Sequence, residues 1–171
     1  MTKYPTGDMG KETTHQLLNR VKPFIGFGPV RFGSTREEVK RLLGEPNHLS
    51  NECYDAGKAI EHWQYDTLKV SLSFYEDEGY KLGAVSFSGT DYDLSGIKLI
   101  GMSEDQLLEH GKTGHLPEPL LDDSVTEMRS RSYEISGMGI VVWCAGSTIE
   151  EFSLYPLYDE GGKQPIWPAY C

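Results

Sequence analysis

An internal repeat constrains this chain more than any other feature of its sequence. Thr35-Arg-Glu-Glu38 and Ser103-Glu-Asp-Gln106 are both capping-box patterns, in which two side chains satisfy the free amides at a helix start. Their first residues are 68 positions apart (103 − 35). Four later landmarks keep this spacing: Val39 with Leu107, Tyr65 with Tyr133, Leu72 with Ile140, and Phe74 with Val142. A recurring spacing of this kind predicts that one structural unit occurs twice.

The repeat continues past a predicted turn with an offset that is one residue shorter. Val85 then matches Phe152, and Phe87 matches Leu154; a turn is where such a length change is expected. Chance similarity of short amphipathic patterns is the alternative interpretation. The repeat divides the chain into four parts: an N-terminal segment with a short helix (1–24), a first unit (25–90), a second unit (91–156) and a C-terminal tail (157–171).

Hydrophobic spacing predicts the elements of the first unit. An apolar stripe that ends before Gly44 and Pro46 predicts a helix from Thr35 to Leu43. Alternating apolar and polar residues over 68–75 predict a half-buried strand, and 82–87 predict the returning strand of a hairpin. Each unit would thus contain a helix, a connector and about three strands.

Two connectors and the N-terminus have weaker patterns. For the connectors 45–62 and 111–130 we expect a short helix or a covering loop, with a loop favoured in the second. Leu17, Leu18 and Val21 have helical spacing and predict a short helix over 13–22. Strands from both units in series predict an α+β fold with one antiparallel sheet and the helices on one face.

The charge of the chain excludes several classes of partner. Lys and Arg total 16 against 26 Asp and Glu, which gives a formal net charge of −10. Nucleic acids and anionic membranes both require basic surfaces, so we expect neither as a partner. A basic protein partner is compatible with this charge, because opposite charges accelerate encounter. Solubility alone is the simpler explanation.

The cysteines and the N-terminus predict a cytoplasmic protein. Cys53, Cys144 and Cys171 are an odd number at wide spacing, which favours free thiols in a reducing compartment. Residues 1–22 contain no apolar run of the kind found in a signal peptide. We therefore expect no secretion and no membrane anchor.

One stretch of the first unit resembles a known family. Gly33-Ser-Thr-Arg-Glu-Glu-Val-Lys-Arg-Leu-Leu-Gly-Glu-Pro46, followed by Trp63 and the strands, is similar to the unit of the SmpA/OmlA outer-membrane assembly lipoproteins. Two fused copies resemble the architecture of the β-lactamase inhibitor protein. The resemblance covers residues 25–156, although His110-Gly111-Lys112 replaces the Leu-Leu-Gly ending in the second copy.

The resemblance implies a non-catalytic protein that binds another protein. Members of this architecture bind other proteins, in some cases across the open sheet face, and small acidic cytoplasmic proteins also serve as immunity proteins against toxins. The chain departs from the family by having neither a lipoprotein leader nor paired cysteines. In the inhibitor architecture an acidic hairpin tip can enter a partner's cleft, so the resemblance implies a contact role for Glu76, Asp77 and Glu78.

Strand alternation predicts which side chains face away from the helices. Tyr and Trp contribute strongly to binding energy, so an open face that carries them is a candidate contact surface. The alternative is that the C-terminal tail covers this face, and a solvated turn is the alternative for the acidic tip. The residues predicted for the open face and selected for partner binding are Lys69, Tyr75, Trp143 and Tyr155, with Val141, Ser71, Ser73 and Ser153 beside them.

Patterns typical of catalysis and metal binding are weak in this sequence. Pro29 interrupts the Gly-rich stretch 26–33 and removes an amide that a phosphate loop would need. A pair formed by Cys53 and His62 has no evident orienting group, and the acidic pair Glu150-Glu151 is interpreted as solvated. A metal site from His110 and His115 with Asp122 and Asp123 has no cysteine ligand. We expect no catalytic residue, no metal and no cofactor.

The sequence therefore favours a non-catalytic protein-binding protein of the inhibitor or immunity type, which contacts its partner with the open sheet face and the hairpin tips. The second hypothesis is a module that binds a small molecule or a peptide in the groove between the two units. An enzyme is the third, and it would require a buried polar cluster with shifted pKa values.

Overall fold

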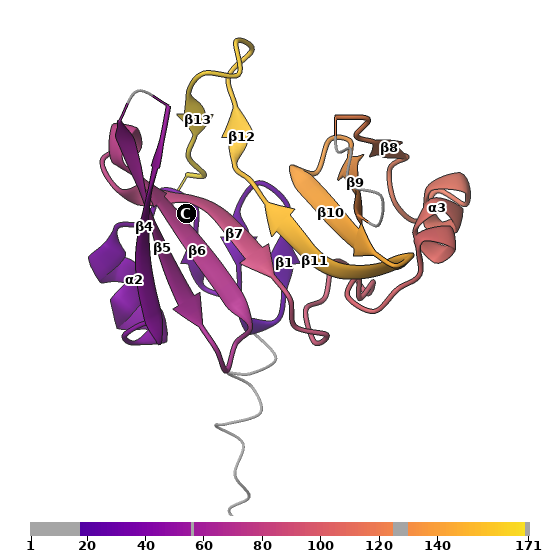
Figure 1. Ribbon diagram of the computed structural model, residues 1–171, viewed down its shortest axis with the longest axis horizontal. Coiled ribbons are helices and arrows are strands. Elements are labelled where there is room, and N and C mark those ends of the chain that lie inside the picture. The colour runs from indigo at the N-terminus through magenta and orange to yellow at the C-terminus, as the bar shows by residue number, and fades with distance from the viewer. Residues whose placement is uncertain (1–17, 56, 125–129, 170–171) are drawn as a thin grey trace, which may run out of the picture.

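The computed structural model describes residues 18–55, 57–124 and 130–169. These residues form an α+β fold, as predicted, with two α-helices and a large antiparallel sheet (Figure 1). The helices are α2 (Arg36–Leu43) and α3 (Glu104–Lys112). Both begin with the predicted capping box: Thr35 accepts from the amide of Glu38, and Ser103 accepts from that of Gln106.

Eight strands form the sheet, and consecutive strands pair except at its centre. β7 pairs with β11, so two groups of four strands meet there (Figure 1). In spatial order the strands are β4 (His48–Tyr54), β5 (Lys58–Tyr65), β6 (Val70–Tyr75), β7 (Lys81–Phe87), β11 (Thr148–Leu154), β10 (Ile140–Ala145), β9 (Ser130–Ile135) and β8 (Pro119–Leu121).

The first connector is a strand hairpin, so the expectation of a helix or loop over 45–62 was wrong. β4 and most of β5 occupy it, with seven residue pairs between them. Every residue of β4 except Tyr54 is exposed. A strand exposed on both faces needs no apolar alternation, which is why the sequence carries no strand pattern there. In the second connector, β8 is a three-residue strand.

A small three-stranded sheet covers the inner face of the large one. It consists of β1 (Val21–Lys22), β2 (Gly26–Phe27) and β3 (Val30–Arg31). The prediction of a helix over 13–22 is therefore wrong for its last residues. The backbone amide of Val21 instead donates a hydrogen bond to the carbonyl of Asp93. Residues 13–17 lie outside the described residues. Pairing with distant backbone has overridden a short helical pattern.

Aromatic side chains fill the core where the two groups of strands meet. Phe87 of β7 and Phe152 of β11 stack with ring centroids 4.7 Å apart. Phe27 and Tyr92 contact Phe87 edge-on at 5.3 and 4.6 Å. The predicted alternation is also present, since Leu72 is buried while its neighbours on β6 are half-buried. The core therefore lies between the large sheet and the layer of helices, β1–β3 and loops.

The tail folds against the N-terminal layer. β12 (Leu157–Tyr158) and β13 (Pro165–Ile166) form a hairpin that projects from the end of β11 (Figure 1). Trp167 then packs on Gly33, and Arg31 donates a hydrogen bond to the carbonyl of Ala169 at 2.7 Å. No helix in the described parts of the chain has the length and apolar content to cross a lipid bilayer.

The aromatic cluster makes the centre of the fold sensitive to truncation. Phe87→Ala should lower the free energy of unfolding by about 3–5 kcal/mol, because Phe87 is fully buried between three rings. Urea denaturation measures the loss. Leu49→Ala on β4 is the control, and its effect should stay below about 0.5 kcal/mol because Leu49 is 53% exposed. Equal effects of the two substitutions would contradict this account of the core.

Candidate functional site

Two hollows lie on the sheet face opposite the helices. The first has a volume of about 460 Å³ and the second about 420 Å³. Ser88 and Glu151 line both, so the hollows join into one depression, which we name the junction groove. Its remaining lining residues are Gln64, Tyr65, Asp66, Lys69, Val70, Ser71, Ser86 and Phe87 on one side and Ser130, Trp143, Cys144, Ala145 and Glu150 on the other.

Small hydroxyl side chains form the floor of the junction groove. Ser86 and Ser153 lie directly opposite each other in the β7–β11 ladder, and their hydroxyls are joined by a 2.9 Å hydrogen bond. Ser71 lies opposite Ser86 on the next strand. β6 and β7 thus present the serines Ser71 and Ser86 in the depression, and Ser153 of β11 is buried beside them. The groove therefore exists because the outward positions at the centre of the sheet are small.

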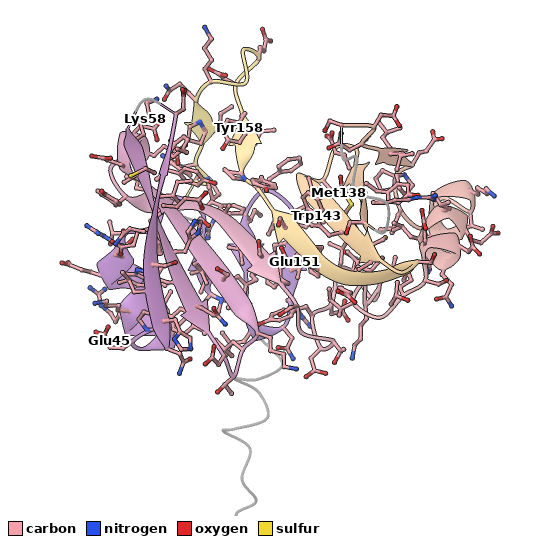
Figure 2. All side chains as sticks on the ribbon, viewed as in Figure 1. Glu45, Lys58, Met138, Trp143, Glu151 and Tyr158 are labelled. Atoms are coloured by element: carbon pink, nitrogen blue, oxygen red, sulfur yellow. The ribbon has the colours of Figure 1, made fainter. Side chains whose placement is uncertain are left out.

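Trp143 and Glu151 form one wall of the groove. They are directly opposite each other on β10 and β11, and Figure 2 labels both. Trp143 is 37% exposed, which is high for an indole. Partial desolvation in the concave surface raises the pKa of Glu151, although the residue is exposed. Within the described residues the Glu151 carboxylate forms no hydrogen bond or ion pair, so this wall offers an aromatic edge and an uncompensated acid.

The other residues predicted for the open face lie in two different places. Lys69 lines the groove from the turn before β6, where it has a φ of 51°. Tyr155 lies just after β11 and donates its backbone amide to Gly139, outside the groove. Tyr75 lies at the far end of β6, where its ring contacts that of Tyr54 with centroids 5.9 Å apart. The structure therefore brings Lys69 and Trp143 to one groove and separates Tyr75 from it.

Residues of the acidic tip make hydrogen bonds within the chain. The tip is a 3-10 turn (Glu76–Glu78) between β6 and β7. Glu76 accepts from the amide of Ala59, and Asp77 accepts from the Tyr54 hydroxyl and the Lys58 ammonium at 2.8 and 3.2 Å. These bonds, led by that from Tyr54, lower the pKa of Asp77. The tip thus fastens the β4–β5 hairpin to the β6–β7 hairpin.

Glu78 is the tip residue with a buried carboxyl. Burial, with a smaller contribution from the charge of Asp77, raises its pKa to about 6. One carboxyl oxygen is enclosed without a hydrogen-bond partner among the described residues. It lies beside Gly83, where an added Cβ atom would meet both this carboxyl oxygen and the Tyr75 ring. The tip that was predicted to enter a partner is therefore largely engaged with its own chain.

A chain of polar groups crosses the outer strands away from the groove. His62 contacts the hydroxyl of Ser73 through Nδ1 at 2.9 Å and the carboxylate of Glu52 through Nε2 at 3.3 Å. The order hydroxyl, imidazole and carboxylate is that of an activated nucleophile, but acyl transfer also requires donors for the developing oxyanion. Neither hollow of the groove includes these residues. Cys53, considered as a partner of His62, is exposed and opposite Ala59.

The residues considered for a metal site are not gathered into one. His110 and His115 contact each other edge-on at 5.7 Å, while Asp122 accepts hydrogen bonds from Ser124 and Ser132. Within residues 18–55, 57–124 and 130–169, no group of three or more His, Cys, Asp or Glu could hold a metal ion. The histidines and the acid therefore belong to separate local networks.

Comparisons with known proteins identify no family. No protein-family model matches the chain, and no curated protein matches it. Among solved structures, an extracellular protein containing a SCP domain from Bacillus anthracis matches 91% of this chain at 12% identity, with a TM-score of 0.46. The match spans 50% of that protein.

The predicted resemblance to the SmpA/OmlA unit and to the β-lactamase inhibitor protein was wrong. No family model and no curated protein supports either resemblance, and the structural match found is to the SCP-domain protein. The motif that suggested them, a glycine, a capped short helix and a Leu-Gly-x-Pro ending, describes a common way to start and stop a helix. The role that the resemblance implied for the acidic tip loses its basis with it.

The groove also shows what the sequence interpretation missed. Glu151 was grouped with Glu150 as a solvated pair, and Ser86 and Ser88 were not selected. For Ser86 the usable signal was its outward position on β7, between the inward apolar residues Val85 and Phe87. The β-bulge between Trp143 and Cys144 could not be seen in the sequence, although it determines that Trp143 pairs with Glu151.

The buried carboxyl at the tip predicts a pH effect on stability. Because the pKa of Glu78 is about 6 when folded and 4.5 ordinarily, the folded chain binds this proton more tightly. The protonated Glu78 carboxyl therefore contributes to the free energy of unfolding below pH 4.5, and this contribution is lost as the pH rises through 6. Glu78→Gln should remove about 1 kcal/mol of this pH dependence, allowing for solvent screening. Urea denaturation at several pH values measures it.

Glu37→Gln is the control for this measurement, because Glu37 is exposed on α2. It should leave the pH profile of the unfolding free energy as in the wild type. A Glu78→Gln variant with the wild-type profile would show that Glu78 titrates normally in the folded protein.

Proposed function

We propose that this chain is a non-catalytic protein-binding protein that contacts its partner with the open sheet face at the junction groove. The observation that carries the proposal is the groove itself, a depression at the centre of the large sheet that the described residues leave open. No described residue of the tail lines it. An exposed tryptophan at its wall suits a binding anchor, because Trp is enriched among residues that dominate binding energy.

The proposed contact surface is narrower than the sequence suggested. It includes Trp143, Lys69 and Glu151, and it leaves out the acidic tip because the tip carboxylates serve the chain's own hairpins. The formal charge of −10 supports a partner with a basic surface. A partner of this kind would bind non-covalently in the groove, and the chain would catalyse no reaction on it.

We also propose that the two groups of strands are copies of one unit. A β-bulge falls between Ser73 and Phe74 in one and between Trp143 and Cys144 in the other, at the same point of each hairpin. The residue before each helix bridges to the last strand of its own group, as Thr35 does with Lys81 and Ser103 with Thr148. These matches involve backbone geometry, which short amphipathic patterns do not reproduce by chance.

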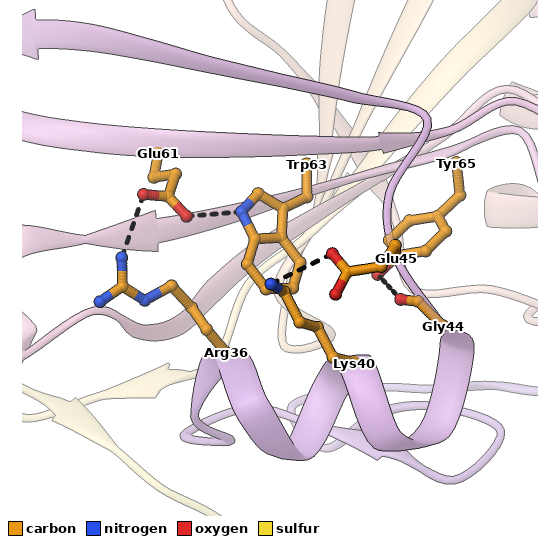
Figure 3. Close-up of polar contacts among 7 residues, drawn as sticks. All are labelled: Arg36, Lys40, Gly44, Glu45, Glu61, Trp63 and Tyr65. Atoms are coloured by element: carbon orange, nitrogen blue, oxygen red, sulfur yellow. Dashed lines mark hydrogen bonds and ion pairs between the residues drawn. The ribbon is translucent and has the colours of Figure 1, made fainter.

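Two ion pairs with reversed charges support the same proposal. In the first group Arg36 on α2 pairs with Glu61 on β5 at 3.0 Å, and the Trp63 indole donates to that carboxylate (Figure 3). In the second, the acid is on the helix: Glu104 on α3 pairs with Arg131 on β9 at 3.0 Å and accepts from the Tyr133 hydroxyl.

The strand registers also change the predicted offset of 68 between β5 and β9 and between β6 and β10 to 70. Tyr133 occupies the ladder position of Trp63, 70 residues earlier (133 − 63), rather than that of Tyr65. Between β7 and β11 the offset is 67 (153 − 86). With this offset the pair Phe87–Phe152 corresponds to the pair Leu154–Val85, and the pair Ser86–Ser153 corresponds to itself with its two members exchanged. A pseudo-two-fold axis would then pass through the pair Ser86 and Ser153.

The same axis favours the second candidate function, a module that binds a small molecule or peptide between the units. One hollow is lined almost entirely by the first group of strands and the other mainly by the second, and both lie beside the axis. A groove at the boundary of two repeated units is a usual place for a ligand. This candidate differs from the first in the occupant of the groove.

The partner hypothesis predicts a specific loss on truncation of the groove wall. Trp143→Ala should weaken capture of the partner from the native host at least about tenfold, because a central Trp anchor supplies much of a contact's energy. Quantitative affinity purification against wild type measures the loss.

Leu42→Ala on α2 is the matched control, since Leu42 is also apolar and 46% exposed but lies on the helix side. It should retain every protein that the wild type captures. If no captured protein depends on Trp143, the face does not bind a protein, and the small-molecule or peptide candidate takes its place.

The duplication predicts that the ion pair of the first unit tolerates reversal. Arg36→Glu should cost about 1–2 kcal/mol, because it puts a second acid beside the largely buried Glu61. Adding Glu61→Arg should restore at least half, since the second unit holds an acid on its helix and an arginine on its strand. Urea denaturation compares the variants, with Glu37→Lys as an exposed control. A double variant no more stable than Arg36→Glu would contradict the equivalence.

A further inference from the structure

The groove wall is where the two proposed copies differ most. Next to the bulge, the first copy pairs Ser73 with Ala84 across β6 and β7, and the second pairs Trp143 with Glu151 across β10 and β11. The inward neighbours stay apolar in both copies, since Phe74 and Cys144 are each buried. The second copy therefore carries a tryptophan and a carboxylate where the first carries two small residues.

The charges around the groove are unbalanced. Among the described residues, its charged lining residues are Asp66, Glu150, Glu151 and Lys69, three acids and one base. Asp66 is engaged within the chain, because it contacts His48 at 3.0 Å and accepts a hydrogen bond from Gln64 at 3.0 Å. The carboxylates of Glu150 and Glu151 make no hydrogen bond or ion pair within the described residues. Among the described residues, no basic group is therefore bonded to the acidic wall.

We propose that the junction groove seats an arginine or lysine side chain of an extended segment of the partner, held between the indole of Trp143 and the carboxylate of Glu151. The proposal rests on the proposed protein-binding function and specifies the chemistry of the partner. It commits to a basic segment because the uncompensated charge of the wall is negative.

The geometry suits this guest in two ways. Residues directly opposite in an antiparallel pair have Cβ atoms about 5 Å apart, so one side chain can contact both Trp143 and Glu151. A cation within about 6 Å of an indole ring is attracted by the ring, and a guanidinium can also form paired hydrogen bonds with a carboxylate. Arginine can make both contacts at once because its guanidinium is planar, so it should bind more tightly than lysine.

Length and shape favour an extended segment over an isolated cation. The two hollows have volumes of about 460 and 420 Å³ and meet at Ser88 and Glu151, so the depression continues on both sides of the proposed cation site. Hydroxyls of Ser71, Ser86 and Ser88 line the floor beside it and can donate to or accept from a peptide backbone. A segment lying along the groove would place one basic side chain at its middle.

Titration of the protein with a short arginine peptide tests the proposal. The probe is Ac-Gly-Ser-Gly-Arg-Gly-Ser-Gly-NH2, and the control peptide has citrulline, which is neutral and of the same shape, in place of arginine. NMR signals of the three indoles, assigned by Trp→Phe variants, report binding. The NMR signal of the Trp143 indole should shift when the arginine peptide is added up to about 10 mM, a concentration at which even one weak contact is detected. The citrulline peptide should leave this signal unshifted.

Substitution of the acid completes the test. Glu151→Gln should weaken the arginine peptide at least about tenfold, because it removes a charge-assisted contact, and Glu37→Gln on α2 should leave its affinity unchanged. An unshifted Trp143 signal, equal binding of the citrulline peptide, or an unaltered affinity in Glu151→Gln would each overturn the proposal.

The peptide experiment and the partner experiment fail independently. If Trp143→Ala loses a partner that Glu151→Gln binds normally, and the peptide does not bind, the protein-binding function stands and its guest is not a cation. If the peptide binds at Trp143 but no captured protein depends on that residue, the cation site stands and the proposed protein partner falls.

Discussion

The pairing of β7 with β11 is the contact on which the other features of this molecule depend. Three residue pairs join the two groups of four strands. Below the sheet, the stacked rings of Phe87 and Phe152 connect the cores of both groups. On the outer face of the sheet, the hydroxyls of Ser86 and Ser153 share a hydrogen bond, and these small side chains do not fill the surface. One short ladder therefore makes the core continuous and creates the depression on the opposite face.

The two sides of this ladder follow different physical requirements. Inward positions must fill space, so they carry buried apolar residues in both groups. Outward positions are free of this requirement, and there Trp143 and Glu151 differ from Ser73 and Ala84. If the units arose from one ancestor, the packing of the sheet would have been kept while its outer surface diverged. This separation of packing from surface chemistry explains why the groove has an aromatic, acidic side and a plainer side.

How much the sequence predicts depends on whether an element has one buried face. The hairpin of β6 and β7 and both capped helices follow from alternation and capping alone. β4 has no buried face and was missed, and Val21 joined a strand because of distant backbone partners. For the site, Trp143 and Lys69 could be selected from alternation. Glu151 could not, since its place opposite Trp143 depends on the bulge and on β11 following β10.

The order in which the strands occur along the chain has a consequence for how the protein is made. β4 to β7 are neighbours in sequence, so their hairpins can form as soon as they leave the ribosome. The partner of β7 is the last strand of the sheet, with Val85 paired to Leu154. During synthesis β7 therefore exposes an unpaired edge and the face of Phe87 until residues 148–154 arrive. Such an edge can pair with another chain, which makes the final strand the step that protects the nascent protein from aggregation.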